Sequence, residues 1–328
     1  MRLKRSLDPK VFPFSSTNAV LLGPPQMRAG RSDEAENLPA SLFLSGAPAF
    51  RRAAQEWKSQ ALKSVSELWA YRNLTYNLAQ RELRSRYKKS LLGWLWSLLN
   101  PASVLAVYTL VFGYFFNNQA PTAGNGSTSV FALYLFAGLW VWNLFNGTVL
   151  GAIAALQSSG PLLNKVYFPP ACPALANTIT VLLQAMIEAG ILLFIMILLG
   201  NVGWMLVLFP LLILCITLFS VGVGLALSVY NVFYRDVNYL VTIGMNVLFY
   251  ATPIIYSITL VEKKSMTLAR IMELNPIAQY VQWSRDIFYG LTMPSVSSLI
   301  VVPLASFAIF VLGLAIFNRK SRDIAQEL

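Results

Sequence analysis

The feature of this sequence that most constrains its fold is a series of long apolar segments that contain no lysine or arginine. A helix needs about 20 apolar residues to cross the hydrocarbon core of a bilayer. None of the segments alternates as a barrel strand does, and an open sheet cannot cross lipid because its backbone groups would be unpaired. We therefore predict an all-α integral membrane protein with six transmembrane helices, over residues 94–116, 130–156, 175–199, 204–230, 239–258 and 299–317.

Composition supports the membrane class. Hydrophobic residues make up 56% of the 328 residues and charged residues only 12%, against roughly 25% charged in an ordinary soluble domain. The net charge of +11 first raises nucleic acid as a partner. The basic residues are concentrated before the first apolar segment, however, so membrane orientation and contact with lipids explain them better. We expect no nucleic-acid partner.

The distribution of lysine and arginine predicts the orientation of the chain. Sixteen of them precede the first span. If the N-terminus is inside, 21 lie on the inner side and only four on the outer side. The positive-inside rule then places both termini, including residues 318–328, in the cytoplasm. The later inner residues are Lys165, Arg235, Arg319, Lys320 and Arg322, and the outer ones are Lys263, Lys264, Arg270 and Arg285.

Two segments precede the first span. Residues 1–55 mix proline, serine, glycine and arginine without a sustained period and contain no secretory signal, so we predict a basic, flexible cytoplasmic tail. Residues 56–93 combine apolar residues at helical spacing with a basic face, which predicts amphipathic helices in the cytoplasmic interface. The alternative is a solvated juxtamembrane segment that only fixes topology.

Two connections between spans are unusual. The inner connection, residues 157–174, is too polar and proline-rich to cross a membrane. The outer connection, residues 259–298, is long and contains short amphipathic pieces at 266–274 and 276–289. We predict short re-entrant or interface-lying helices in this outer region.

The sequence contains no pattern typical of a catalytic, cofactor or metal site. It has no P-loop, no G-x-S-x-G and no H-E-x-x-H. It has no histidine, and its two cysteines, Cys172 and Cys215, are too far apart in the sequence to form a ligand pattern. We therefore expect a chain that is not an enzyme and binds no cofactor or metal.

A few residues within or beside the spans are candidates for function. Glu188 is the only charge deep in a span, which is costly in lipid; the alternative is a glutamate that is satisfied by packing against other helices. Gly147 and Gly151, and Gly222 and Gly224, indicate close helix packing.

Aromatic rings could line a path for a glycan or could simply pack, and the candidates are Tyr108, Phe112, Phe115, Phe249 and Tyr250. The pair Arg235–Asp236 forms either a local salt bridge with a topological role or a contact with a cytoplasmic partner.

Four stretches resemble the permeases of ABC-2 type exporters, and within that family those that export O-antigen and teichoic acid. The resemblance covers residues 74–328 and is specific for the family more than for the substrate. The stretches are RELRSRYKKSLLGWLWSLLNP (81–101), NKVYFPPACPAL (164–175), YNVFYRDVNYLVTIGMNVLFYATPIIYS (230–257) and NPIAQYVQWSRDIFYG (275–290).

The resemblance implies a homodimeric permease that pairs with two separate ATPase subunits, which bind ATP and magnesium. Hydrolysis there would drive a lipid-linked polysaccharide across the bacterial cytoplasmic membrane. ATPase coupling would then fall to Glu82, Arg84, Arg86, Tyr87, Asn164, Lys165, Tyr167, Phe168, Pro169, Arg235 and Asp236. The outer re-entrant region would be formed around Asn275, Pro276, Trp283, Arg285 and Asp286.

The segment before Leu74 is longer than is usual in this family. Basic, extended members resemble permeases that export cell-wall galactan, which slightly favours that glycan over O-antigen or teichoic acid. Two alternatives stay open at this point. One is an ABC-2 exporter of drugs or small lipids, and the other is a membrane protein of glycan assembly that does not transport.

Overall fold

The computed structural model describes residues 66–88, 93–117, 120–163 and 165–321. Within these ranges the chain consists of helices and their connections, and no described residue forms a β-strand. The all-α class predicted from the sequence is confirmed. Several predictions lie outside the described residues: the tail over 1–55, the interface segment before residue 66, Asn164, the residues after Ser321, and the side chains of Arg86 and Tyr87.

Five helical segments of the described chain are long and apolar enough to cross a membrane. Their bounds agree with five predicted spans to within a few residues. The third begins earlier than predicted, because Pro173 occupies the first turn of the helix, where proline is tolerated. They are α4 (Trp96–Tyr108) with its π-helical continuation η2 (Thr109–Phe115), α5 (Phe131–Ser158), α7 (Ala171–Leu198), α8 (Phe209–Phe233) with the preceding turn η3 (Trp204–Leu208), and α13 (Val296–Lys320).

The remaining predicted span, residues 239–258, is shorter in the structure. Helix α9 (Val237–Ala251) has 15 residues, which is about 22 Å at 1.5 Å per residue. Pro253 explains the early end, because a residue before proline avoids the helical conformation, and Thr252 is extended. The boundary at residue 258 is therefore wrong, and the count of six spans stays a prediction.

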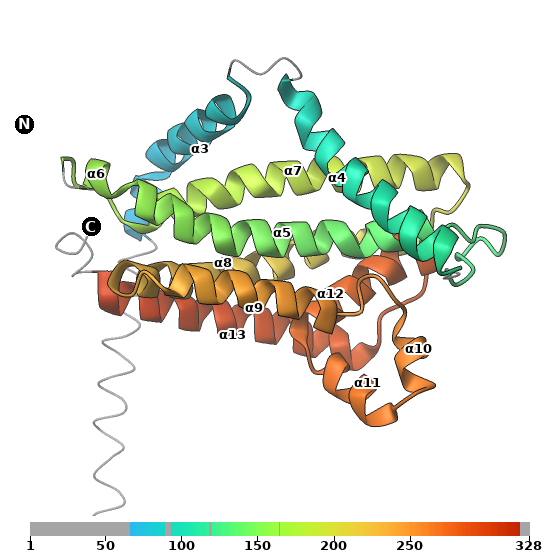
Figure 1. Cartoon of the computed structure of the whole chain (residues 1–328). Coiled ribbons are helices and arrows are strands. Elements are labelled where there is room, and N and C mark those ends of the chain that lie inside the picture. The colour runs from blue at the N-terminus through green and yellow to red at the C-terminus, as the bar shows by residue number, and fades with distance from the viewer. Residues whose placement is uncertain (1–65, 89–92, 118–119, 164, 322–328) are drawn as a thin grey trace, which may run out of the picture. The chain divides into compact units, whose positions relative to one another are not determined.

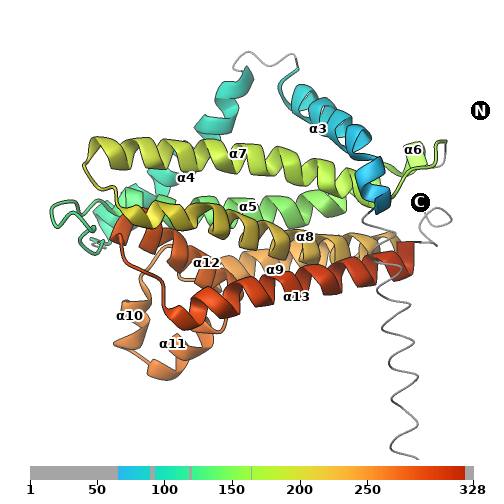
Figure 2. The same ribbon diagram turned by 180° about the vertical axis from the view of Figure 1, so that it is seen from behind.

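Helix α5 is the centre of the packing. Helices α7 and α8 pack on it, and α13 packs on α8 (Figures 1 and 2). Glycines permit the closest approaches: Gly313 of α13 lies against the backbone of Gly222 in α8, and a Cβ on Gly224 would contact Ala152 of α5. The predicted role of Gly222 and Gly224 in helix packing is therefore confirmed.

Helices α3 and α4 lie at the periphery. Helix α3 (Arg72–Tyr87) packs on α7 through a face that includes the buried Thr75 and Ala79, while Arg72, Arg81 and Arg84 are exposed. The exposed arginines give α3 a basic face, and its place in a membrane interface stays a prediction. Helix α4 follows the short turn η1 (Gly93–Leu95), and most of its surface is exposed.

The connection before α13, which the sequence predicts to lie on the outer side, contains three short helices. They are α10 (Ile258–Glu262), α11 (Met266–Glu273) and α12 (Pro276–Arg285), and α12 continues into the π-helical η4 (Asp286–Gly290). Asn275 caps α12, since its side chain accepts a hydrogen bond from the Ile277 backbone N–H at 3.0 Å. Figures 1 and 2 show α12 turned back beside the long helices, while α10 and α11 project from them.

Basic residues gather at the opposite end of the bundle from α10 and α11. Lys320, at the end of α13, stacks over the rings of Tyr230 and Phe233 near the end of α8. The short helix α6 (Gly160–Leu163) and Lys165 lie at the same end, beside α3 (Figure 1). The structure thus brings together the ends that the charge distribution assigns to the inner side.

Candidate functional site

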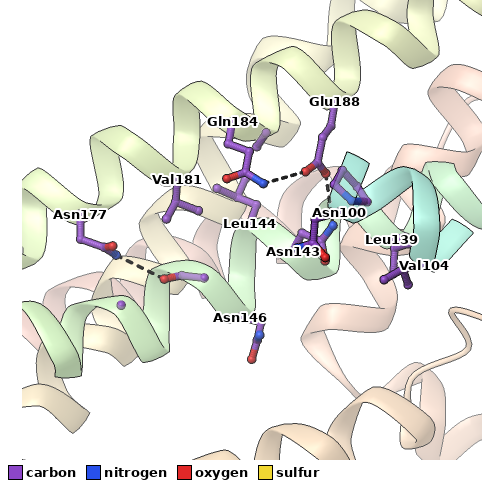
Figure 3. Close-up of a pocket in the computed structure, with 14 residues that line it drawn as sticks. Asn100, Val104, Leu139, Asn143, Leu144, Asn146, Asn177, Val181, Gln184 and Glu188 are labelled. Atoms are coloured by element: carbon purple, nitrogen blue, oxygen red, sulfur yellow. Dashed lines mark hydrogen bonds between the residues drawn. The ribbon is translucent and has the colours of Figure 1, made fainter. Parts of the chain in front are cut away.

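Glu188 lies in a cavity of about 250 Å³ between α4, α5 and α7. Its side chain is 1% exposed. One carboxylate oxygen accepts a hydrogen bond from the Asn143 amide at 3.2 Å, and the other accepts one from the Gln184 amide at 3.2 Å. Figure 3 shows these three groups converging, with Asn100 of α4 beside them. Both oxygens of the buried carboxylate thus have amide partners from two helices.

Two glycines of α5, Gly147 and Gly151, line part of this cavity. Asn177 of α7 lies across them and donates a hydrogen bond to the Gly147 carbonyl oxygen at 3.2 Å (Figure 3). A Cβ on Gly151 would overlap the Asn177 amide, and a Cβ on Gly147 would approach Val181. The G-x-x-x-G pattern therefore makes room for a polar side chain as well as for close packing.

The face of α4 that lines this cavity also carries aromatic rings further along the helical segment. Asn100, Val104, Tyr108 and Phe112 recur at four-residue spacing, which places them on one face of the helical segment. Asn100 and Val104 line the cavity, and Tyr108 stacks on Phe249 of α9 with ring centroids 6.1 Å apart. One face of α4 thus joins the polar cavity to the aromatic group.

The aromatic candidates are brought together, with one exception. The ring centroid of Phe249 lies 5.2 Å from that of Tyr250 and 5.3 Å from that of Trp142 in α5. The ring centroids of Tyr108 and Phe112 are 6.0 Å apart. Phe115 is 69% exposed and contacts Tyr114 instead of the group around Phe249. The contacts extend from Trp142 through Phe145 and Phe219 to Tyr280.

Arg285 holds the outer region against the bundle. Its guanidinium is 3% exposed and donates hydrogen bonds to the carbonyl oxygens of Tyr134, Pro253 and Ile254. It also lies 3.9 Å from the centre of the Tyr134 ring. Arg285 therefore connects α12 to α5 and to the corner that follows α9, a structural role that the sequence did not indicate.

The other predicted outer residues also act in packing. Asn275 donates to the Thr252 hydroxyl at 2.8 Å, and the Trp283 indole donates to the Ser298 hydroxyl at 3.0 Å. Asp286 accepts a hydrogen bond from Gln282 at 2.8 Å, and its partial burial raises the pKa of the carboxyl. Pro276 is the first residue of α12, where its missing N–H costs nothing.

A second cavity, of about 650 Å³, opens at the basic end between α3, α5 and α7. Arg81 and Glu82 of α3 line it together with Lys165, and Gly151 and Asn177 line both this cavity and the one around Glu188. The two cavities are therefore neighbours along the groove between α5 and α7.

The predicted ATPase-coupling residues differ in their accessibility. Lys165 and Tyr167 are exposed, whereas Phe168 and Pro169 are buried just before α7 begins. The Tyr167 hydroxyl donates to the Glu67 carboxylate at 3.2 Å, and the charge of Glu67 raises the pKa of Tyr167. Glu82 and Arg84 are exposed on α3. The exposed part of this surface can meet a partner, and the coupling role itself stays a prediction.

The pair Arg235–Asp236 lies in the turn between α8 and α9. Both side chains are exposed, and the structure shows no ion pair between these two described residues. The interpretation as a local salt bridge is thereby weakened, and a partner contact stays a prediction.

Residues 73–289 match the family model described as ABC-2 type transporter. The chain belongs to the ABC-2 type transporter family. The transporter is 28% identical over 268 residues to the O-antigen export system permease protein RfbA of Myxococcus xanthus, covering 81% of this chain and 100% of the relative. It is 25% identical over 254 residues to the RfbA protein of Klebsiella pneumoniae, covering 76% and 93%. It is 22% identical over 245 residues to the polysialic acid transport protein KpsM of Escherichia coli, covering 73% and 90%.

Glu188 stands out in the sequence as a charge within a span, but its surroundings do not. Asn100, Asn143, Asn177 and Gln184 are amides inside apolar helices, and such residues cost free energy in lipid unless they find partners. Their presence in the spans was a signal in the sequence. Which of them face Glu188 follows only from how α4, α5 and α7 are arranged.

Proposed function

We propose that this chain is the permease subunit of an ABC transporter that exports a lipid-linked polysaccharide across the bacterial cytoplasmic membrane. Two copies of the permease would pair with two separate ATPase subunits, and both termini would lie in the cytoplasm. The observation that carries the proposal is the match over the whole length of a relative whose name describes it as an O-antigen export permease.

Two features of the chain support the proposal. The sequence has no P-loop, so the energy of ATP has to come from a partner. Tyr108, which stacks on Phe249, lies about one helical turn from Val104, a residue that lines the polar cavity around Glu188. Sugars present both hydroxyl groups and apolar ring faces. A site for such a ligand combines aromatic walls with a few directed polar groups.

The test is the ATPase activity of the purified chain in lipid, measured alone and after co-expression with a candidate ATPase subunit. We expect no activity from the chain alone. With the subunit we expect a stable complex of two plus two chains whose hydrolysis rate responds to a lipid-linked glycan. A chain that binds no ATPase subunit would overturn the proposal.

A further inference from the structure

We infer that the cavity around Glu188 selects neutral, hydroxyl-rich sugars and rejects acidic ones. This inference rests on the proposed function, because it names the class of glycan that the permease would accept. It concerns the part of the path between the basic end of the bundle and the aromatic group.

The lining of the cavity has the chemistry of a sugar site. Five residues that line it carry side-chain amides, and each amide has two donors and an acceptor. The Asn100 amide, which lies beside Glu188 in Figure 3, makes no hydrogen bond to any other residue that the structure describes, so its capacity is open to a ligand. The amide residues are Asn100, Asn143, Asn146, Asn177 and Gln184.

Glu188 adds acceptors that suit hydroxyl donors. Each carboxylate oxygen accepts one amide hydrogen bond, from Asn143 or from Gln184. A carboxylate oxygen can accept two, so each retains capacity for a sugar hydroxyl. The two amides fix the orientation of the carboxylate before a ligand arrives, which reduces the entropy lost on binding.

The charge of the lining argues against an acidic sugar. None of the described residues that line this cavity is a lysine or an arginine, and its one ionisable side chain is Glu188. An acidic sugar would lose its hydration in this cavity without a cation among the described lining residues to pair with it. The Glu188 carboxylate would add a like-charge repulsion. The cations Arg81 and Lys165 line the neighbouring cavity at the basic end.

The test uses the full chain in lipid nanodiscs and two lipid-anchored disaccharides that carry the same photoreactive group. One probe is neutral, and in the other a carboxylate replaces one hydroxymethyl group. Mass spectrometry then measures the label on α5 and α7. We expect the neutral probe to label these helices about tenfold more than the acidic probe, which corresponds to one modest like-charge interaction.

The variant Glu188→Gln removes the charge and keeps the shape. We expect it to raise labelling by the acidic probe to within about twofold of the neutral probe. The matched control Glu262→Gln makes the same chemical change in α10, outside the cavity, and should leave the ratio unchanged. If Glu188→Gln does not fold, Asn100→Asp tests the same point in reverse, because a second carboxylate beside Glu188 should strengthen the preference for the neutral probe.

The outcomes separate the inference from the proposed function. Equal labelling of the wild-type chain by both probes would overturn the inference. So would a Glu188→Gln variant whose ratio of neutral to acidic labelling is unchanged. In both cases the proposed function stands if the chain still forms an active complex with its ATPase. Failure to associate with any ATPase subunit would overturn the proposed function as well. Labelling confined to other helices would also overturn the inference.

Discussion

The guanidinium of Arg285 lies where three parts of the chain meet, and its hydrogen bonds all go to backbone carbonyl oxygens. Two of them belong to Pro253 and Ile254, in the non-helical corner after α9. A buried carbonyl without a donor is costly. Arg285 therefore donates hydrogen bonds to carbonyl groups that lie outside α9 because Pro253 ends the helix. The same side chain fixes α12 against α5.

We expect Arg285→Ala to destabilise the protein by about 3 kcal/mol, because it leaves buried carbonyl groups unpaired. Arg285→Lys should recover only part of this loss, since an ammonium cannot reproduce the planar fork of the guanidinium. Thermal unfolding of the purified protein in detergent measures both effects. The control is Arg270→Ala on the exposed surface of α11, and a melting temperature for Arg285→Ala equal to that of this control would contradict the assignment.

Gly151 and Asn177 form a second residue-scale test. A Cβ at position 151 would overlap the Asn177 amide, so we expect Gly151→Ala to cost about 1–3 kcal/mol, as overpacking does. Asn177→Ala removes the obstacle, and the double variant should be more stable than the sum of the two single effects predicts. Gly190→Ala, where nothing lies within 4 Å of the new Cβ, is the control. Additive effects at Gly151 and Asn177 would show that the two do not meet.

At the scale of elements, hydropathy predicted the long helices because each one must satisfy its own backbone in lipid. The exceptions have local causes. Pro253 shortens α9, and Pro173 falls within the first turn of α7. Both effects depend on where the proline lies relative to a helix end. A hydropathy average over a window of residues does not contain this information.

The segment from α6 to the start of α7 carries the coupling prediction. Only part of it is available to a partner, since Lys165 and Tyr167 are exposed and Phe168 is buried. We expect the double variant Lys165→Ala/Tyr167→Ala to lower glycan export at least about tenfold while ATP hydrolysis in the complex continues, because the contact that transmits the motion is lost.

Export and hydrolysis are measured in parallel on the same proteoliposomes. Lys263→Ala changes an exposed residue just after α10, on the connection predicted to face outward. This control should leave both rates unchanged. Folding is checked by thermal unfolding, since Tyr167 also bonds Glu67. Normal export in the double variant would remove this segment from the docking surface.

At the scale of the whole molecule, the sequence predicted where the spans run but not how their faces combine. Tyr108 and Phe249 are 141 positions apart, and Asn143 and Glu188 are 45 apart, yet each pair meets across helices. Nothing in a periodic pattern tells which faces of α4, α5, α7 and α9 turn toward one another. For the same reason Arg285 could be predicted only as an outer loop charge, although it is buried.

The orientation of the molecule gives the last prediction. Lys165 and Arg235 lie at the basic end and Lys263 and Arg270 lie on the outer connection, so a reagent that cannot cross the membrane should separate the two pairs. The native cysteines, Cys172 and Cys215, are buried and give little background. In spheroplasts we expect Lys263→Cys and Arg270→Cys to react with an impermeant maleimide, and Lys165→Cys and Arg235→Cys to react only after the membrane is opened. Each variant serves as the control for the opposite side. The reverse pattern would place both termini outside and remove the surface on which a cytoplasmic ATPase could act.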